Sequence, residues 1–402
     1  MLFIPLKTYP SRKAPRIFNL LLTALITAWL GALAPAVAQP VKTTADFAVI
    51  MDYETGEVLF EKNARTPTAP ASMSKLMTTA IVFERLKEGT LSLSDKFSVS
   101  EKAWRMGGSK MWVRVDTEIE LANLLRGVII QSGNDACIVI AENISGSEDA
   151  FAELMNAKAR EWGLNDSTFA NATGWPHPDH KMSTRDLALL ARKIISEYSE
   201  FYQLFAETEF TWEKIRQPNR NPLLTVFDGA DGLKTGRTDE SGFGLVGSAI
   251  KGDARRILVL NGLESARERN SESARLLRLA FNDFGTKVFY PAESVVGDAS
   301  VFKGKSKTIP LIVKDQVDLL LHRSLHDTTK ATVVYTGPVS APIAAGQQIG
   351  YLRVVAESGN GKEYPLYAGA SVAEVGFFGK VSIAARKLFL KPDRSQQQQN
   401  NP

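Results

Sequence analysis

The amino-acid sequence predicts a layered α/β domain followed by a smaller all-β unit. Between residues 40 and 285, apolar residues recur at helical spacing in some segments and alternate at strand spacing in others. Strands with helices on their faces make a layered α/β domain. After Pro291, short apolar and β-branched runs alternate with Gly and Pro turns, a texture typical of β structure.

The elements expected in the first domain follow from these two spacings. Residues 47–51 and 57–60 flank a turn and predict a hairpin, and residues 242–250 and 256–260 predict two antiparallel strands. Ser183 is the expected N-cap of one helix, because an acidic residue follows three positions later. Helices are expected over residues 73–86, 121–130, 135–143, 150–162, 184–196 and 273–284.

The first 38 residues have the pattern of an export signal. Four basic residues precede an apolar run over residues 17–33, and Ala36-Val37-Ala38 supplies a small-x-small cleavage site. A retained membrane anchor is the alternative, because the run is about long enough to span a bilayer. Polar Gln39 after the cleavage site favours removal, which would leave 364 of the 402 residues. The basic residues are Lys7, Arg12, Lys13 and Arg16.

The composition excludes several classes of protein. Hydrophobic residues make up 44% of the chain and charged residues 23%, as in ordinary globular proteins. The formal net charge of +4 gives no sign of nucleic-acid binding. Cys137 is the only cysteine, which excludes an internal disulfide and a thiolate metal cluster. It lies in an apolar stretch, so we expect a small buried hydrophobic residue there.

Ser72 and Lys75 are the candidate nucleophile and base. They follow Pro70 at the start of a predicted helix, and their spacing puts the lysine one turn up on the same face. The positive end of a helix favours a developing alkoxide, and a neutral lysine beside the serine can take its proton. A helix cap with a solvated lysine is the simpler explanation of this pair when it is taken alone.

The same Ser-x-x-Lys pattern occurs at residues 248–251 and 300–303. The first copy falls on a predicted strand and its turn, and the second lies in the β-rich region. Residues i and i+3 of an extended chain face opposite sides, so neither of these pairs can act together.

Two further motifs change the assessment of Ser72. Ser132-Gly133-Asn134 lies in a turn after an apolar helix, and Lys234-Thr235-Gly236 begins a predicted strand. Another Ser-x-Asn, at residues 358–360, lies in a loop of the C-terminal unit and out of order, while Lys-Thr-Gly occurs once. The three motifs in this order are the set that penicillin-recognising serine enzymes share.

Over nearly the whole mature chain, the sequence resembles the low-molecular-mass penicillin-binding proteins of the D-alanyl-D-alanine carboxypeptidase type, the penicillin-binding protein 5/6 group. The resemblance rests on the segments at residues 70–78, 131–136 and 231–236. Residues 169–174 and the β-rich region up to Phe378 fit less strictly.

The resemblance implies a domain organisation along the chain. A serine β-lactamase/penicillin-binding transpeptidase-like domain, with an antiparallel sheet flanked by helices, is expected at residues 40–285. A small C-terminal all-β domain follows at residues 286–375. The signal peptide at residues 1–38, an amphipathic membrane-associating helix at 376–391 and a disordered tail at 392–402 complete the expected organisation.

The resemblance implies catalytic roles for three side chains. Ser72 attacks the carbonyl of the penultimate D-alanine, Lys75 accepts its proton, and Ser132 relays a proton toward the leaving amine. The backbone N–H groups of Ser72 and Arg237 form the oxyanion hole, usually the largest single term in catalysis. Arg237 departs from the family pattern, in which histidine often follows Lys-Thr-Gly, and its charge adds to the attraction of a carboxylate.

The resemblance also implies substrate-binding residues. Asn134 holds a substrate amide, and Lys234 and Thr235, followed by Gly236, face the terminal carboxylate. Arg269 matches a family arginine that assists carboxylate binding. A surface residue at a helix entry is the alternative for Arg269.

Glu161 lies in a segment, Glu161-Trp162-Gly163-Leu164-Asn165, that resembles the Glu-x-x-Leu-Asn carrying the deacylation base of class A β-lactamases. Here Glu161 is expected to end a helix, with Gly163 as its C-terminal stop. A structural role is therefore favoured.

Neither a cofactor nor a metal is expected. His177 and His180 lie with Asp179 in a loop, while His322 and His326 have i, i+4 spacing but fall among predicted strands. Neither pair has a third ligand of the usual kind, so turn and surface roles are favoured.

The segment at residues 376–391 is expected to lie on a membrane. Apolar residues recur along one helical face, and basic residues border it, as in helices that bind anionic membranes. Packing against its own domain is the alternative, and the resemblance favours the outer face of the inner membrane. The apolar face comprises Phe377, Val381, Ala384 and Leu388, and the basic residues are Lys380, Arg386, Lys387 and Lys391.

The motifs and the resemblance together imply a periplasmic serine-type D-Ala-D-Ala carboxypeptidase. Its expected partners are peptidoglycan stem pentapeptides, which lose their terminal D-alanine, and β-lactams, which acylate Ser72. A β-lactamase is the enzymatic alternative, disfavoured by the β-rich domain, the terminal helix and Gly133 of the second motif. A wall-binding or morphological protein with little activity is the other alternative. The intact Ser72, Lys75, Ser132 and Lys234 argue against it.

Overall fold

The computed structural model describes residues 41–357, 359, 361–377, 379 and 381. The signal peptide predicted at residues 1–38 and the tail predicted at 392–402 lie outside these residues, as does most of the helix predicted at 376–391. Among the described residues, none of the helices combines the length and the apolar character that crossing a bilayer requires.

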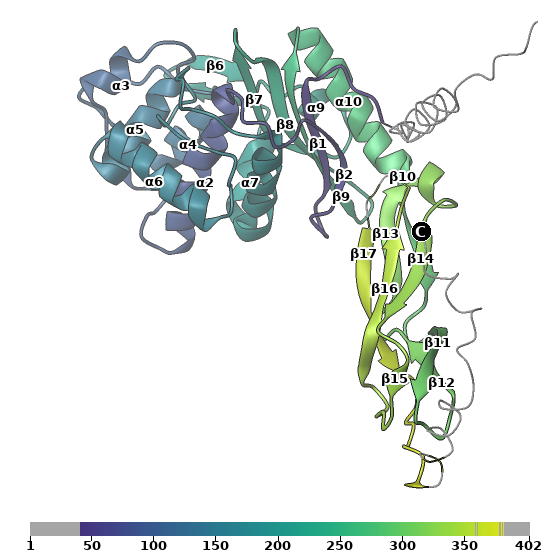
Figure 1. Cartoon of the computed structure of the whole chain (residues 1–402). Coiled ribbons are helices and arrows are strands. Elements are labelled where there is room, and N and C mark those ends of the chain that lie inside the picture. Colours follow the sequence, from purple (N-terminus) through teal and green to yellow (C-terminus); the bar gives the residue numbers. More distant parts are fainter. Residues whose placement is uncertain (1–40, 358, 360, 378, 380, 382–402) are drawn as a thin grey trace, which may run out of the picture. The chain divides into compact units, whose positions relative to one another are not determined.

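The first domain is organised around a five-stranded sheet with strand order β2-β1-β9-β8-β7 (Figure 1). Each neighbouring pair is antiparallel. β7 is one of the two edge strands, and it carries the Lys-Thr-Gly motif. The strands are β1 (Phe47–Asp52), β2 (Val58–Lys62), β7 (Ala230–Thr238), β8 (Gly242–Lys251) and β9 (Ala254–Leu263).

Helices cover both faces of this sheet (Figure 1). Side chains alternate along β1, so that Val49 and Met51 join a core with the helices of one face, whereas Ala48 and Ile50 join a core with α10 on the other. The larger helix layer contains α2 (Lys75–Lys87), α4 (Leu121–Ile129), α5 (Asn134–Ser145), α6 (Glu148–Glu161) and α7 (Thr184–Glu197), and the smaller contains α9 (Leu223–Val226) and α10 (Ala266–Asn282).

Short elements connect these layers and shape the loops around the site. They are η1 (Ala71–Ser74), β3 (Lys96–Ser98), α3 (Glu101–Arg105), β4 (Glu118–Glu120), α8 (Ser199–Tyr202), η2 (Gln203–Ala206), β5 (Glu209–Trp212) and β6 (Ile215–Pro218). β3 pairs with β4 and β5 with β6, each as an antiparallel hairpin outside the main sheet.

The predicted fold class is confirmed, and one helix boundary was wrong. α10 begins at Ala266, seven residues before the expected start at residue 273. The first turns of α10 are polar, so apolar spacing does not reveal them. Ser265 caps this helix by accepting a hydrogen bond from the Glu268 backbone N–H (3.1 Å), while Glu268 Oε2 accepts from the Glu264 N–H (2.9 Å).

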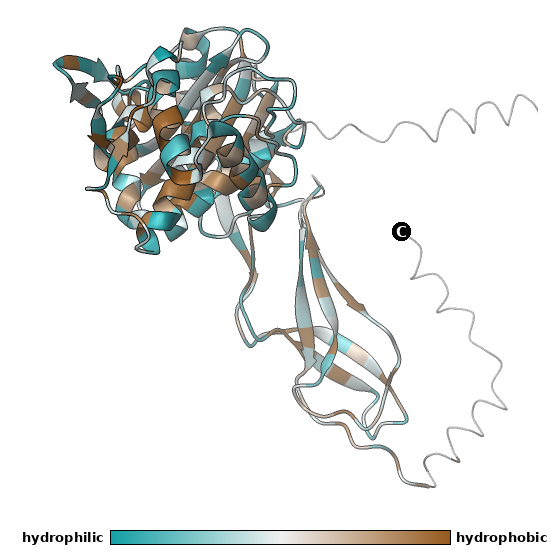
Figure 2. Ribbon diagram, turned by 90° about the vertical axis from the view of Figure 1, so that its left-hand side faces the viewer, coloured by the Kyte–Doolittle hydropathy of each residue, from teal (hydrophilic) through white to brown (hydrophobic). Residues whose placement is uncertain are grey.

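Among its described residues, the C-terminal domain is all β apart from one short 3₁₀ turn, η3 (Arg323–Leu325). A six-stranded sheet has the order β14-β16-β17-β12-β11-β15, and β10 pairs separately with β13. Apolar and polar residues alternate along these strands (Figure 2), which gives the domain its own core around Leu311, Leu352 and Leu366. The strands are β10 (Phe284–Tyr290), β11 (Val295–Phe302), β12 (Thr308–Ile312), β13 (Val317–His322), β14 (Lys330–Tyr335), β15 (Val339–Ser340), β16 (Gln348–Val355) and β17 (Gly361–Ala368).

Candidate active site

Ser72 and Lys75 lie where a tight turn leads into α2. The sequence predicted that Ser72 opens an α-helix, but it lies in the 3₁₀ turn η1, and α2 begins at Lys75. The tighter turn begins at Ala71, whose φ of +50° is uncommon for a residue with a side chain. Lys75 Nζ donates a hydrogen bond to Ser72 Oγ over 2.9 Å, so the candidate base contacts the candidate nucleophile.

The Lys75 amine is buried and contacts two further acceptors. Its Nζ donates to Asn134 Oδ1 (2.8 Å) and to the carbonyl oxygen of Thr173. The lysine is completely inaccessible to solvent. Burial lowers the pKa of Lys75 to about 8, because the charged form loses its hydration. Roughly a tenth of the amine is therefore neutral at pH 7, and this fraction, which can accept a proton, rises to about half at pH 8.

Ser132 and Lys234 form a second serine–lysine contact. Lys234 Nζ donates to Ser132 Oγ over 2.9 Å, across 102 residues of sequence. Burial, and next the positive charge of Lys75, hold the pKa of Lys234 well below its usual range. Ser132 has a φ of +59°, a strained conformation of a kind that concentrates at functional sites.

The remaining residues of the Ser-x-Asn and Lys-Thr-Gly motifs lie around these two contacts. Asn134 begins α5, and its Nδ2 donates to the Gly107 carbonyl (2.9 Å) while its oxygen holds Lys75. Thr235 is 6% exposed on β7. Gly236 lies against the turn that carries Ser72, because a Cβ atom there would be 2.9 Å from the Pro70 carbonyl oxygen. β7 therefore runs directly beside η1.

Two predicted arginines converge on one aromatic ring beside β7. The guanidinium carbons of Arg237 and Arg269 lie 5.3 and 5.9 Å from the ring centroid of Phe243. Arg237 also pairs with exposed Asp239 (2.7 Å). Arg269 lies in the first turn of α10 and is partly buried. Its Nε is buried and has no hydrogen-bond partner among the described residues.

Asn171 organises the loop that supplies the Thr173 carbonyl. Its Oδ1 accepts from the backbone N–H groups of Thr173 (3.1 Å), Gly174 (2.8 Å) and Trp175 (3.0 Å), and from the Thr173 hydroxyl (2.9 Å). Asn171 lies in the segment at residues 169–174, which matches the family less strictly and gave this residue no role. An asparagine that bonds to the backbone two and three residues on is the signal of an Asx turn, and that turn aims the carbonyl at Lys75.

Gly174 lets this loop approach the nucleophile. Its φ is +78°, and a Cβ atom there would lie 2.0 Å from the Ala71 carbonyl oxygen and 2.6 Å from Ser74 Oγ. Both the conformation and the space therefore require glycine.

Two charged residues that sequence analysis did not identify support the site. The buried Asp135 carboxylate accepts hydrogen bonds from the backbone N–H groups of Met111 (2.8 Å) and Trp112 (2.8 Å), and so ties the loop before β4 to the start of α5. Arg220 donates to Ser109 Oγ (2.6 Å) in the same loop. Its positive charge contributes to the lowered pKa of Lys75 and Lys234. Asp135 lies within the segment at residues 131–136 but had no role assigned, and no motif pointed to Arg220, because both act through a loop distant in sequence.

The residues considered for β-lactamase or metal chemistry have structural contacts. Glu161 ends α6, is 58% exposed and pairs with Lys158 (3.0 Å), while Gly163 stops the helix with a φ of +73°. The buried His180 ring accepts from the Ala170 N–H (3.2 Å), and burial lowers its pKa to about 4. His326 contacts the Gly285 carbonyl (3.1 Å). Within the described ranges, no group of His, Cys, Asp and Glu residues is suited to a metal.

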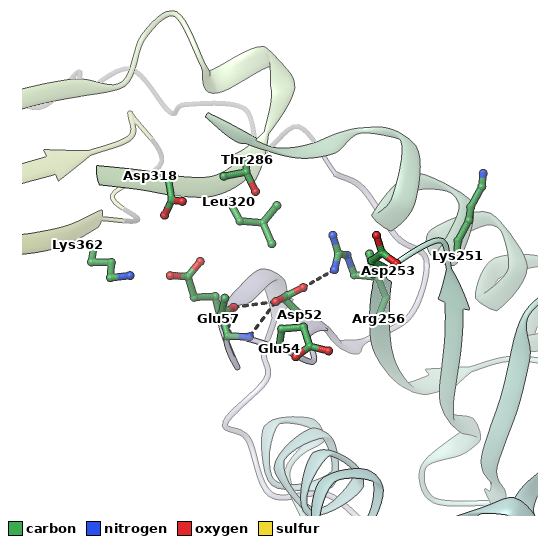
Figure 3. A pocket seen from close by; sticks show the side chains of 12 residues that line it. Asp52, Glu54, Glu57, Lys251, Asp253, Arg256, Thr286, Asp318, Leu320 and Lys362 are labelled. Carbon is green, nitrogen blue, oxygen red and sulfur yellow. Dashed lines mark hydrogen bonds and ion pairs between the residues drawn. The ribbon is translucent and has the colours of Figure 1, made fainter. Parts of the chain in front are cut away.

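A charged pocket of about 450 Å³ (Figure 3) lies away from the candidate catalytic residues. Asp52, on its wall, accepts hydrogen bonds from the backbone N–H (3.0 Å) and hydroxyl (2.9 Å) of Thr55 and pairs with buried Arg256. Neither Ser72 nor Lys75 lines it, and neither do Ser132 and Lys234. The Asp52–Arg256 pair satisfies two buried charges within the fold.

The geometry defines a class of protein. A serine held by a buried lysine, a second serine held by a lysine on an edge strand, and an asparagine between them form the site of the penicillin-recognising serine enzymes. The family model for D-alanyl-D-alanine carboxypeptidase matches residues 34–264, and the model for the penicillin-binding protein 5 C-terminal domain matches residues 284–374.

Relatives of the chain share both its sequence and its fold. D-alanyl-D-alanine carboxypeptidase DacF of Bacillus subtilis (strain 168) is 35% identical, over 83% of this chain and 87% of the relative. DacC of Escherichia coli (strain K12) is 36% identical, over 83% and 85%. The crystal structure of DacD from Francisella tularensis has a TM-score of 0.75 at 31% identity and covers 84% of this chain and 95% of that one. The chain belongs to the D-alanyl-D-alanine carboxypeptidase family, which confirms the resemblance expected from its motifs.

The lowered pKa of Lys75 predicts how acylation of Ser72 by a penicillin depends on pH. Below about 8 the amine holds its own proton and cannot take one from Ser72, so the second-order acylation rate constant should rise with pH through about 8 and then level off. Stopped-flow measurement with a fluorescent penicillin from about pH 6 to 10 gives the profile. Circular dichroism at each pH checks folding.

Lys75→Arg is the matched variant for this profile. Its guanidinium stays charged throughout the range, so acylation should be slow and the rise through pH 8 should be lost. A flat profile in the native chain, with folding intact, would contradict the role of Lys75 as the base.

Proposed function

We propose that this chain removes the terminal D-alanine from peptidoglycan stem pentapeptides through an acyl-enzyme on Ser72, and that β-lactams acylate the same oxygen. The observation that carries the proposal is the contact between Lys75 Nζ and Ser72 Oγ at 2.9 Å, with the lysine fully buried. A buried amine with a lowered pKa is the form of lysine that activates a serine.

The first half-reaction transfers the peptide to the enzyme. Ser72 Oγ attacks the carbonyl carbon of the penultimate D-alanine while its proton passes to Lys75 Nζ. Backbone N–H groups of Ser72 and Arg237 stabilise the oxyanion. The C–N bond then breaks, and the proton that Lys75 took from Ser72 passes through Ser132, which Lys234 contacts, to the leaving amine. Lys75 is thereby neutral again.

The second half-reaction hydrolyses the ester. A water oxygen attacks the acyl carbon and gives a proton to Lys75, the base in contact with Ser72 Oγ. The bond between the carbonyl carbon and Ser72 Oγ breaks, and the proton returns to that oxygen. Glu161, exposed at the end of α6 and paired with Lys158, has no part in this step.

Positive charge and a free strand edge support recognition of the peptide. Lys234 and Thr235 face the terminal carboxylate, with Arg237 and Arg269 close to them over the Phe243 ring. β7 is an edge strand of its sheet, and an edge offers backbone N–H and C=O groups to an extended peptide. Asn134 contacts Lys75 through its Oδ1 and the Gly107 carbonyl through its Nδ2.

The proposed activity predicts release of free D-alanine from a pentapeptide ending in D-Ala-D-Ala. The native chain should release it, and Ser72→Ala should lower kcat/KM by about 10³-fold or more, because the nucleophile is lost. A coupled D-amino-acid oxidase assay measures the product.

Ser74→Ala is the matched control for that assay. Ser74 Oγ bonds to the Ala71 carbonyl (3.0 Å), so its loss should leave most of the activity. Fast hydrolysis of penicillin without release of D-alanine would overturn the proposal in favour of a β-lactamase. Neither activity would favour a wall-binding protein.

We further propose that the mature chain is periplasmic and is attached to the outer face of the inner membrane through residues 376–391. The export signal at residues 1–38 and the basic border of the C-terminal segment support this location. Phe377 is 75% exposed and Val381 is 52% exposed, and both belong to the apolar face that the sequence predicts.

Truncation after Gly376 tests this attachment. The shortened chain should move from the membrane fraction to the soluble periplasmic fraction, since it loses the apolar face and its basic border. Full-length Ser72→Ala is the control, because it keeps the segment and removes covalent attachment to wall peptides. A truncated chain that stays with the membrane would disprove the attachment.

A further inference from the structure

Trp175 is a large apolar side chain held beside the reacting groups. Its side chain is 47% exposed, although its backbone is fixed. The N–H of Trp175 donates to Asn171 Oδ1 (3.0 Å), and its carbonyl accepts from Asn171 Nδ2 (3.0 Å). The same asparagine orients the Thr173 carbonyl that holds Lys75. The indole is thus anchored to the loop that positions the base.

The indole ring lies against the loop that contains Gly107, whose carbonyl accepts a hydrogen bond from Asn134 Nδ2. A Cβ atom on Gly108 would be 2.9 Å from Trp175 Cζ3 and 2.7 Å from Asn134 Nδ2, so both groups border the same small space. A Cβ atom on Gly107 would be 3.8 Å from Trp175 Cη2. Two glycines therefore leave one edge of the ring beside the Asn134 amide, while much of the ring stays open to solvent.

Trp175 differs in this respect from the other exposed tryptophans near the site. Trp112 has the amine of Lys110 5.6 Å from its ring centroid, and Trp104 has the guanidinium of Arg105 at 5.8 Å. Within residues 41–357, no cationic side chain and no aromatic ring stacks on the ring of Trp175. The face of this indole is available to a ligand.

The position of Trp175 along the site indicates which part of a substrate would reach it. Lys234 contacts Ser132 at the end assigned to the terminal carboxylate, whereas Asn134 and the Thr173 carbonyl contact Lys75. Trp175 borders Asn134 across Gly108 and shares the Asn171 loop with Thr173. A peptide with its carboxylate at Lys234 and its scissile carbonyl at Ser72 therefore extends its acyl side toward the indole.

We propose that Trp175 is a specificity-determining residue, which packs against the side chain of the residue that precedes the penultimate D-alanine. The inference rests on the proposed carboxypeptidase function. A long unbranched side chain that ends in an amino group fits this surface best, because its methylenes cover the indole face and its ammonium is attracted to the ring. A methyl side chain at that position is too short to do either.

The test compares two substrates in the full-length enzyme: N-acetyl-L-Lys-D-Ala-D-Ala and N-acetyl-L-Ala-D-Ala-D-Ala. In the native enzyme kcat/KM should favour the lysine peptide by about tenfold, the discrimination expected from a few methylenes on an apolar wall. Trp175→Ala should bring the ratio close to one, and Trp175→Phe should restore part of it. Trp112→Ala is the matched control, because the ring of Trp112 is also exposed but has Lys110 Nζ 5.6 Å from its centroid. This variant should leave the native ratio unchanged.

The outcomes separate this inference from the proposed function. A loss of kcat/KM that is equal for both peptides in Trp175→Ala would overturn the inference, because it would mean that the indole only supports the Asn171 loop. An unchanged ratio would overturn it as well. If the native enzyme releases D-alanine from neither peptide, the proposed function itself has failed.

Discussion

The site depends on satisfying one buried amine. Lys75 has no contact with solvent, and an unpaired ammonium or amine in such a place is costly. Its three acceptors come from separate parts of the chain: Ser72 Oγ from η1, Asn134 Oδ1 from the start of α5, and the Thr173 carbonyl from a loop. Because all three acceptors must meet at one nitrogen, the helices, the loop and the nucleophile have a fixed arrangement. The burial of the same amine lowers its pKa, and this lets it act as a base.

The surrounding fold maintains conformations that are unfavourable in isolation. Ala71 and Ser132 both have positive φ, and Gly174 lies so close to the Ala71 carbonyl that no side chain fits. Such strain persists only where neighbouring structure determines it. Here Asp135 ties the preceding loop to α5, and the core beneath α2 and α5 is fully buried, so that the two serine–lysine contacts rest on rigid elements.

Much of the fold and the centre of the site could be predicted from sequence, because both depend on short-range patterns. Apolar spacing located the sheet and most helices, and fixed motif spacing identified Ser72, Ser132 and Lys234. The hydrogen bonds that assemble the site join residues that are 59, 98 and 102 positions apart in the sequence. Apolar periodicity carries no information about contacts at such separations. Asn171 and Arg220 act through loops that only the folded chain brings to the site, and the polar first turns of α10 concealed the helix that contains Arg269.

The most direct test of the account asks which atom a penicillin modifies. The protein is incubated with penicillin, digested, and analysed by tandem mass spectrometry, which separates Ser72 from Ser74 within one peptide. The drug should be found on Ser72, and Lys75→Ala should accumulate the adduct far more slowly, because the serine has lost the amine that takes its proton. An adduct on Ser132 or elsewhere, or an undiminished rate in Lys75→Ala, would contradict the claim that Lys75 activates Ser72.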